Sequence, residues 1–289
     1  MWIRSSCLIF ALFLSGCGLT QVQKDSISQF SRSSASFGDT VTTQLIDARS
    51  TVMDLNTSVL TLTPQRIKDR DKIDGALPPD RISARIRAAE TLQSYADLLL
   101  ALVEDTQQAE LAAASAKFKE SIRGLDPDSR KLSEEQLTGV GELVEDIGGL
   151  IVEYKKKKAI AAIVPEADAQ VQRIADLFAS EFNTDGPVAK YVNAMGLLAV
   201  TAADSVLDDT NATVQDRIPA VEANRKGIET KRKTDAIYPG LAAAAAQLKA
   251  AHGDIVKGVK ENKITLARLN ELTKTVKELA AHTRLMLKH

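Results

Sequence analysis

The sequence predicts an all-α protein, an elongated antiparallel bundle of about five long, coiled-coil-like helices. Apolar residues recur at alternating spacings of three and four over most of the chain, which is typical of one face of a helix. Aromatic residues make up only 4% of the sequence, so a core must be built mainly from Ala, Leu, Val and Ile, a composition that favours helices. Helices of roughly 45–50 residues would each be about 70 Å long.

The first apolar stripe predicts a helix that begins shortly after residue 25. Ser and Thr are frequent here and weaken the intrinsic helix propensity, so this helix should depend on packing. Thr63-Pro64 is typical of an N-cap followed by proline at the first helical position, so we expect a break or kink there. The stripe comprises Phe30, Ser34, Phe37, Val41, Leu45, Ala48, Val52, Leu55, Val59 and Leu62.

Two further segments follow. Pro78-Pro79 and then Asp80, a candidate N-cap, precede a second helix whose stripe continues through an Ala-rich section to Leu125. Ser133 followed by Gln136 matches a capping box and opens a third segment.

The stretch 148–164 of this third segment leaves two structures open. It contains Gly148-Gly149, an apolar run and the lysines Lys155–Lys158, with Pro165 just beyond. We favour a bent helix kinked at Pro165, but a small β-hairpin or a protruding tip also fits this order.

The fourth helix is expected to start at Asp185-Gly186-Pro187 and to kink at Pro219. Tyr238-Pro239-Gly240 should then restart the chain, and the last helix shows the cleanest heptad pattern. No domain boundary is expected within residues 26–289, which we assign to a single helical-bundle domain. The heptad positions are Leu241, Ala245, Leu248, His252, Ile255, Val259, Asn262, Leu266 and Leu269.

The amino-terminal segment has the features of a secretory signal peptide. Arg4 is the first charge, residues 7–14 form a short apolar run, and small residues follow. A membrane-spanning helix would need about 20 apolar residues, and Gly16 and Gly18 come too early for that.

The end of this leader is more specific. Leu14-Ser15-Gly16-Cys17 resembles the lipobox of bacterial lipoprotein precursors: a branched residue, two small residues and a cysteine. The resemblance implies removal of residues 1–16, a diacylglycerol thioether on Cys17 and further acylation, such as by palmitate, of the new amino group. Residues 17–25 would form a lipidated tether. In that family an Asp after the cysteine tends to retain the protein in the inner membrane, so Gly18 favours the periplasmic face of the outer membrane.

The distribution of charge and the cysteine content limit the kinds of partner and of covalent crosslink that we expect. Cys17 would be the sole cysteine after cleavage, so no intrachain disulfide is possible. Acidic residues are in excess up to residue 224 and basic residues after it. We interpret the basic end as packing beside acidic neighbours, with anionic envelope material as the alternative partner. Export makes nucleic acid an unexpected partner.

For the other candidate site residues, a structural role is a better interpretation than a functional one. His252 lies on the heptad seam without a nearby cysteine or histidine, so it is expected to be a tolerated or water-reaching core residue. Asn262 is expected to fix register. Asp204, Asp208 and Asp209 should lie on a solvated helix face, because hard cations require more oxygens and usually a loop. The lysines Lys155–Lys158 are expected to be solvated. We predict no catalytic, cofactor or metal site.

These observations favour a lipid-anchored, non-enzymatic protein that binds another protein as a scaffold, adaptor, or immunity or inhibitor protein. Its membrane contact would be the lipid on Cys17. An alternative is a membrane-active protein resembling long-helix pore-forming toxins, with residues 148–164 as the tip that contacts the membrane.

Overall fold

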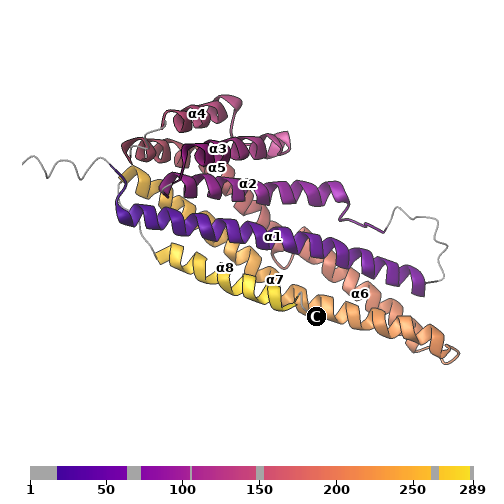
Figure 1. Ribbon diagram of the computed structural model, residues 1–289. Coiled ribbons are helices and arrows are strands. Elements are labelled where there is room, and N and C mark those ends of the chain that lie inside the picture. Colours follow the sequence, from indigo (N-terminus) through magenta and orange to yellow (C-terminus); the bar gives the residue numbers. More distant parts are fainter. Residues whose placement is uncertain (1–17, 64–72, 105, 148–152, 262–266, 287–289) are drawn as a thin grey trace, which may run out of the picture. The chain divides into compact units, whose positions relative to one another are not determined.

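The computed structural model describes residues 18–63, 73–104, 106–147, 153–261 and 267–286. Every regular element in these residues is helical, so the prediction of an all-α fold is confirmed (Figure 1). None of the described helices is long and apolar enough to cross a membrane. The elements are α1 (Gln21–Leu62), α2 (Pro79–Val103), α3 (Gln108–Arg123), a 3₁₀ turn (Pro127–Ser129), α4 (Glu134–Glu145), α5 (Glu153–Phe182), α6 (Pro187–Leu207), α7 (Val214–Glu261) and α8 (Ala267–Met286).

Several predicted boundaries are confirmed. Helix α1 ends at Leu62, next to the expected break, and Phe30 to Leu55 of its stripe are buried. Helix α4 begins with the predicted capping box, in which the Ser133 hydroxyl accepts from the Gln136 amide and the Gln136 side chain accepts from the Ser133 amide. Helix α6 begins after Gly186, with proline at its first position.

The predicted second helix is two helices, which corrects the expectation of one stripe from residue 80 to residue 125. Helix α2 ends at Val103 and α3 begins at Gln108. Lys156, only 1% exposed, donates a 2.6 Å hydrogen bond to the carbonyl oxygen of Glu104. A buried ammonium group therefore satisfies a carbonyl left open at the end of α2, a favourable place for a positive charge.

The predicted fourth helix is also interrupted. Helix α6 ends at Leu207, and residues 208–213 turn the chain before α7 begins. The Thr213 amide donates to the Asp216 carboxylate at 2.9 Å, and the Asp216 amide donates to the Thr213 hydroxyl at 3.3 Å. These reciprocal bonds satisfy amide groups at the first turn of α7.

Proline residues interrupt the helices less than the sequence predicts. Helix α7 runs through both Pro219 and Pro239, so the expected restart at residues 238–240 is wrong. A proline inside a helix costs about 3 kcal/mol or more. Ile237, Tyr238 and Leu241 are all buried around Pro239, and their burial offsets this cost. Helix α5 also continues through Pro165, in agreement with the favoured helical interpretation of this segment from residue 153 onward.

The chain forms two compact units, each assembled from separate stretches. Unit 1 contains residues up to Ala35, Thr91–Arg173 and Ala250–Thr273. Unit 2 contains Ser36–Glu90, Ile174–Lys249 and Lys274 onward.

Unit 1 has a core of aliphatic side chains around a few rings. Phe30 from α1, Tyr95 from α2 and Phe118 from α3 are buried, and the Tyr95 and Phe118 ring centroids lie 5.5 Å apart. Helix α3 packs against α4. The Phe30 and His252 ring centroids lie 5.5 Å apart, so this core also joins segments that are far apart in the sequence.

Unit 2 combines a row of rings with buried ion pairs. The Phe182 ring contacts the rings of both Phe178 and Tyr238. The Phe182 and Tyr238 centroids lie 5.2 Å apart. The Arg85 Nε atom donates to Glu181 at 3.0 Å, and both side chains are largely buried. Charged pairs of this kind hold one arrangement of helices, because separating the partners would leave a buried charge unpaired.

Candidate binding surface

The predicted site residues do not form one cluster. Cys17 and Asn262 lie outside the described residues. Asp204 is in α6, whereas Asp208 is the C-cap and Asp209 lies in the following turn, so the expectation that all three share a helix face is wrong. Among the described residues, no group of three or more His, Cys, Asp or Glu side chains could hold a metal.

Residues 153–164 belong to α5, while 148–152 lie outside the described residues. Of the four lysines in this stretch, Lys155 and Lys158 are exposed and Lys156 is buried. The expectation of a uniformly solvated run is therefore wrong for Lys156, which caps α2.

His252 lies within a buried network of unit 1. Its Nε2 atom lies 2.9 Å from the Tyr95 hydroxyl, and its Nδ1 atom lies 2.9 Å from the Asp168 carboxylate. A neutral imidazole satisfies both contacts when the tyrosine donates to Nε2 and Nδ1–H donates to Asp168. His252 is fully buried, so the water-reaching interpretation is wrong and the core interpretation is confirmed.

Burial and hydrogen bonding shift the pKa values of Tyr95 and Asp168 in this network. Burial, and then the negative charge of Asp168, raise the pKa of Tyr95 well above its ordinary value, so the hydroxyl keeps its proton. The hydrogen bond from His252 lowers the pKa of Asp168, against a smaller opposing effect of desolvation. Because the hydroxyl is enclosed by the core, we interpret the network as a link between α2, α5 and α7 inside unit 1.

The network gives a pH-dependent stability. The pKa of Asp168 is lower in the folded chain than in the unfolded chain, so its carboxylate stabilises the fold above about pH 4 and loses this effect as pH falls through the folded value. Asp168→Asn should therefore lower the melting temperature at neutral pH and flatten its decline between about pH 5 and pH 3. Thermal melts of both proteins across this range test it, and parallel declines would contradict it.

The largest group of exposed apolar side chains lies on α6 and the first half of α7. Of the ten large hydrophobic residues exposed in the described part of the chain, six lie between residues 197 and 228. They are Leu197, Leu198, Val214, Ile218, Val221 and Ile228.

Four of these residues define what we call the α7 outer face: Val214, Ile218, Val221 and Ile228. Their spacings of four, three and seven place them on one side of the helix. Val214 and Ile218 are 75% and 65% exposed. The residues Ala220, Ala223 and Gly227 are buried and belong to the inner side. This part of α7 therefore has a second apolar side that no other described element covers.

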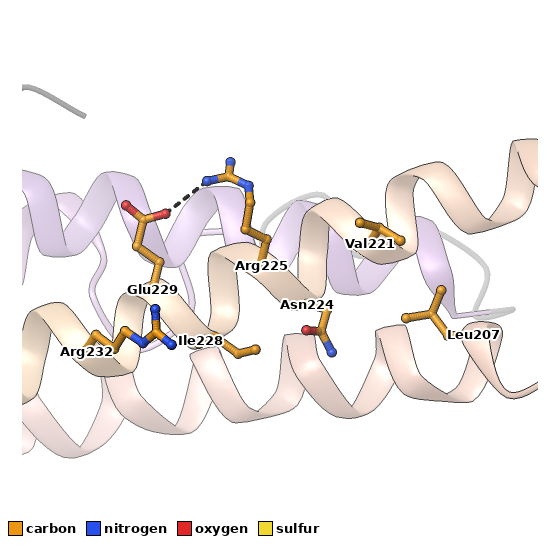
Figure 2. Close-up of a pocket in the computed structure, with 7 residues that line it drawn as sticks. All are labelled: Leu207, Val221, Asn224, Arg225, Ile228, Glu229 and Arg232. Atoms are coloured by element: carbon orange, nitrogen blue, oxygen red, sulfur yellow. Dashed lines mark hydrogen bonds and ion pairs between the residues drawn. The ribbon is translucent and has the colours of Figure 1, made fainter.

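A groove of about 600 Å³ lies along this face (Figure 2). Figure 2 shows Leu207 rising from α6 toward α7, and Asn224 and Ile228 pointing from α7 toward α6. The Asn224 amide, which lines the groove, donates to the Asp204 carboxylate at 2.9 Å and so ties the two helices together. The lining residues are Leu207, Val221, Asn224, Arg225, Ile228, Glu229 and Arg232.

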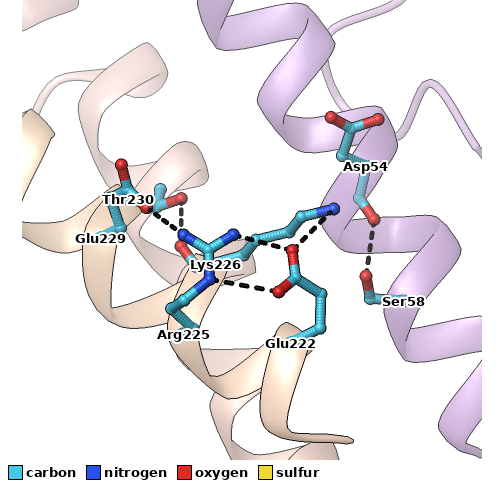
Figure 3. Close-up of polar contacts among 7 residues, drawn as sticks. All are labelled: Asp54, Ser58, Glu222, Arg225, Lys226, Glu229 and Thr230. Atoms are coloured by element: carbon cyan, nitrogen blue, oxygen red, sulfur yellow. Dashed lines mark hydrogen bonds and ion pairs between the residues drawn. The ribbon is translucent and has the colours of Figure 1, made fainter. Parts of the chain in front are cut away.

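The charges on the rim of the groove are largely paired with one another. Arg225 lies between two carboxylates, 2.8 Å from Glu222 and 3.0 Å from Glu229, and Lys226 also approaches Glu222 (Figure 3). The hydrogen bond from Arg225 lowers the pKa of Glu222, so this carboxylate stays ionised. Arg232 differs, because it forms no ion pair within the described residues and stands exposed at one end of the groove.

The sequence contains a signal for this surface. Residues 214, 218, 221 and 228 repeat with helical spacing, and so do 220, 223, 227 and 230 on the other side of the helix. Large apolar residues on one side of the helix and small residues on the other indicate that both sides are suited to contact another helix. The partners of His252 carry no comparable signal, since Tyr95 and Asp168 are 157 and 84 residues away.

Comparisons with models of protein families, with curated proteins and with solved structures find no match to this chain.

Proposed function

We propose that this protein is a bacterial lipoprotein, anchored by lipid on Cys17 at the periplasmic face of the outer membrane, whose helical bundle binds another protein and does not catalyse a reaction. The observation that carries the binding function is the uncovered α7 outer face. Exposed apolar residues gathered on one face mark interaction sites far more often than single exposed residues do. The lipobox carries the anchoring part of the proposal.

The shape of the surface indicates the kind of partner. A groove between two neighbouring helices, with apolar side chains at helical spacing between polar and charged ones, suits an amphipathic helix that adds itself to the pair. The side chains of Ile218, Val221 and Ile228 would contact its apolar stripe. The partner helix should carry a carboxylate near one end, where Arg232 offers an unpaired guanidinium group.

Site-specific crosslinking in cells tests this binding function. A photoreactive amino acid at position 228 should crosslink one partner, which mass spectrometry would identify and map to an amphipathic helix. The same group at Ile46, another exposed isoleucine of unit 2 that lies on α1, should not. Ile218→Glu should weaken the crosslink at least tenfold, because a charge in the contact costs more than about 1.4 kcal/mol.

A control variant and two alternative results decide whether the α7 outer face binds a partner. Ile46→Glu is the matched control and should leave the crosslink intact. Both substituted positions are exposed, so neither variant should lower the melting temperature by more than a few degrees. Equal crosslinking from positions 228 and 46 would contradict the proposal. A product of twice the mass of this chain would assign the face to self-association instead.

A further inference from the structure

The start of the described chain lies against the start of α5. A Cβ atom built on Gly18 would lie 3.2 Å from the Cβ atom of Glu153. The Lys24 Nζ atom lies 2.7 Å from the Glu153 carboxylate, which holds the first turn of α1 at the same place. Neighbouring Cα atoms are about 3.8 Å apart, so covalent geometry alone keeps residue 17 within a few ångströms of Gly18. Lipid on Cys17 would therefore emerge close to the first turn of α5.

The side chains exposed at this place are suited to a membrane surface. Tyr154 is 58% exposed and Val22 is 52% exposed, although both are large and apolar over most of their surface. Lys155 and Lys158 are exposed on the same first turns of α5. Tyrosine and lysine together are typical of the boundary between lipid head groups and water, where a ring and a positive charge are both accommodated.

One acidic group at the start of α5 is neutralised within the chain, and another nearby accepts a hydrogen bond from a neutral amide. Glu153 pairs with Lys24, and Asp25 accepts a 2.8 Å hydrogen bond from Gln21. Lys155 donates to the main-chain carbonyl of Asp146 and forms no ion pair within the described residues. Lys155 and Lys158 present exposed positive charge on the first two turns of α5, beside the exposed carboxylates of Asp25 and Asp146.

We infer that Val22, Tyr154, Lys155 and Lys158 form an anchor-proximal surface that lies on the head groups of an anionic phospholipid bilayer. The inference deepens the proposed function, since it rests on lipid at Cys17 to bring this surface to the membrane. Lysines attract anionic lipid only within about a Debye length, roughly 8–10 Å, and both lysines lie in the first two turns of the helix whose start contacts Gly18. The surface would orient unit 1 on the bilayer as well as holding it there.

The mature chain, residues 17–289, offers a direct probe because it contains no tryptophan. Tyr154→Trp places a single indole on the anchor-proximal surface, and Cys17→Ser in the same chain removes the lipid. Vesicles that contain about one third phosphatidylglycerol should shift the emission of this indole to the blue, whereas phosphatidylcholine vesicles should not. Each lysine that is replaced should reduce the affinity for the anionic vesicles about fivefold, so Lys155→Gln with Lys158→Gln should reduce it about 25-fold.

Lys274→Gln with Lys277→Gln, two exposed lysines of α8, is the matched control and should leave the affinity unchanged. Equal emission with both kinds of vesicle, or no effect of Lys155→Gln and Lys158→Gln, would overturn the inference. Mass spectrometry of the protein purified from cells shows independently whether Cys17 carries lipid. An unmodified Cys17 together with lysine-dependent vesicle binding would overturn the proposed anchor but not this surface.

Discussion

Gly227→Val is expected to destabilise unit 2 by about 3 kcal/mol, because α6 and α7 leave no room for a side chain where they cross. A Cβ atom at Gly227 would lie 2.5 Å from the carbonyl oxygen of Gly196 and 2.7 Å from a methyl carbon of Val200. The carbonyl oxygen belongs to the α6 backbone, so no rotation of a side chain can relieve the contact. The two helices would have to move apart and expose Ala220 and Ala223, which are now fully buried.

The melting temperature should fall by roughly 6–12 °C, as expected for a loss of this size in a chain of this length. Gly253→Ala is the matched control in the same helix, since a Cβ atom there meets nothing within 4 Å. It should raise stability by up to about 1 kcal/mol, because alanine favours helix more than glycine does. If the two substitutions shifted the melting temperature in the same direction, α6 and α7 would not cross as closely as described.

Much of the fold follows from helical periodicity. The stripe from Phe30 to Leu55 and the heptad positions from Leu241 to Ile255 were predicted to face a core, and these residues are buried. Periodicity succeeds here because it reports directly which side of a helix is removed from water.

Periodicity fails where a helix stops without losing its apolar spacing. The breaks near Glu104 and at residues 208–213 lie inside stripes that continue on both sides. What ends α2 includes a contact with Lys156, 52 residues away, and no local pattern shows it. The turn before α7 does carry a local signal, because Asp208, Asp209 and Asn211 are common turn residues.

The candidate surface was missed for a different reason. Inner and outer stripes overlap along α7, and the inner one is made of small residues such as Ala220 and Gly227. Small residues allow α6 to approach closely, and the larger Val221 and Ile228 remain exposed in the groove beside this contact. The small side chains of the inner stripe therefore made it the buried one. Hydrophobicity alone would have predicted burial of the outer stripe.

Cys17→Ser is expected to move the whole protein from the membrane fraction to the soluble periplasmic fraction. Buried acyl chains contribute about 0.8 kcal/mol per CH₂ group, so two or three chains on one residue hold the protein almost irreversibly, while a protein without them depends on weak surface contacts. The few lysines of the anchor-proximal surface contribute about 1 kcal/mol each and cannot replace this. Fractionation and immunoblotting measure the change.

Cys7→Ser is the matched control, because it replaces the other cysteine of the chain within the predicted leader and leaves Leu14-Ser15-Gly16-Cys17 intact. It should leave the protein in the membrane fraction, and on a density gradient that fraction should be the outer membrane. Membrane retention of the Cys17→Ser protein would contradict the anchor. Retention that was then lost on adding Lys155→Gln and Lys158→Gln would show that head-group contacts, and not a thioether-linked lipid, hold the protein in place.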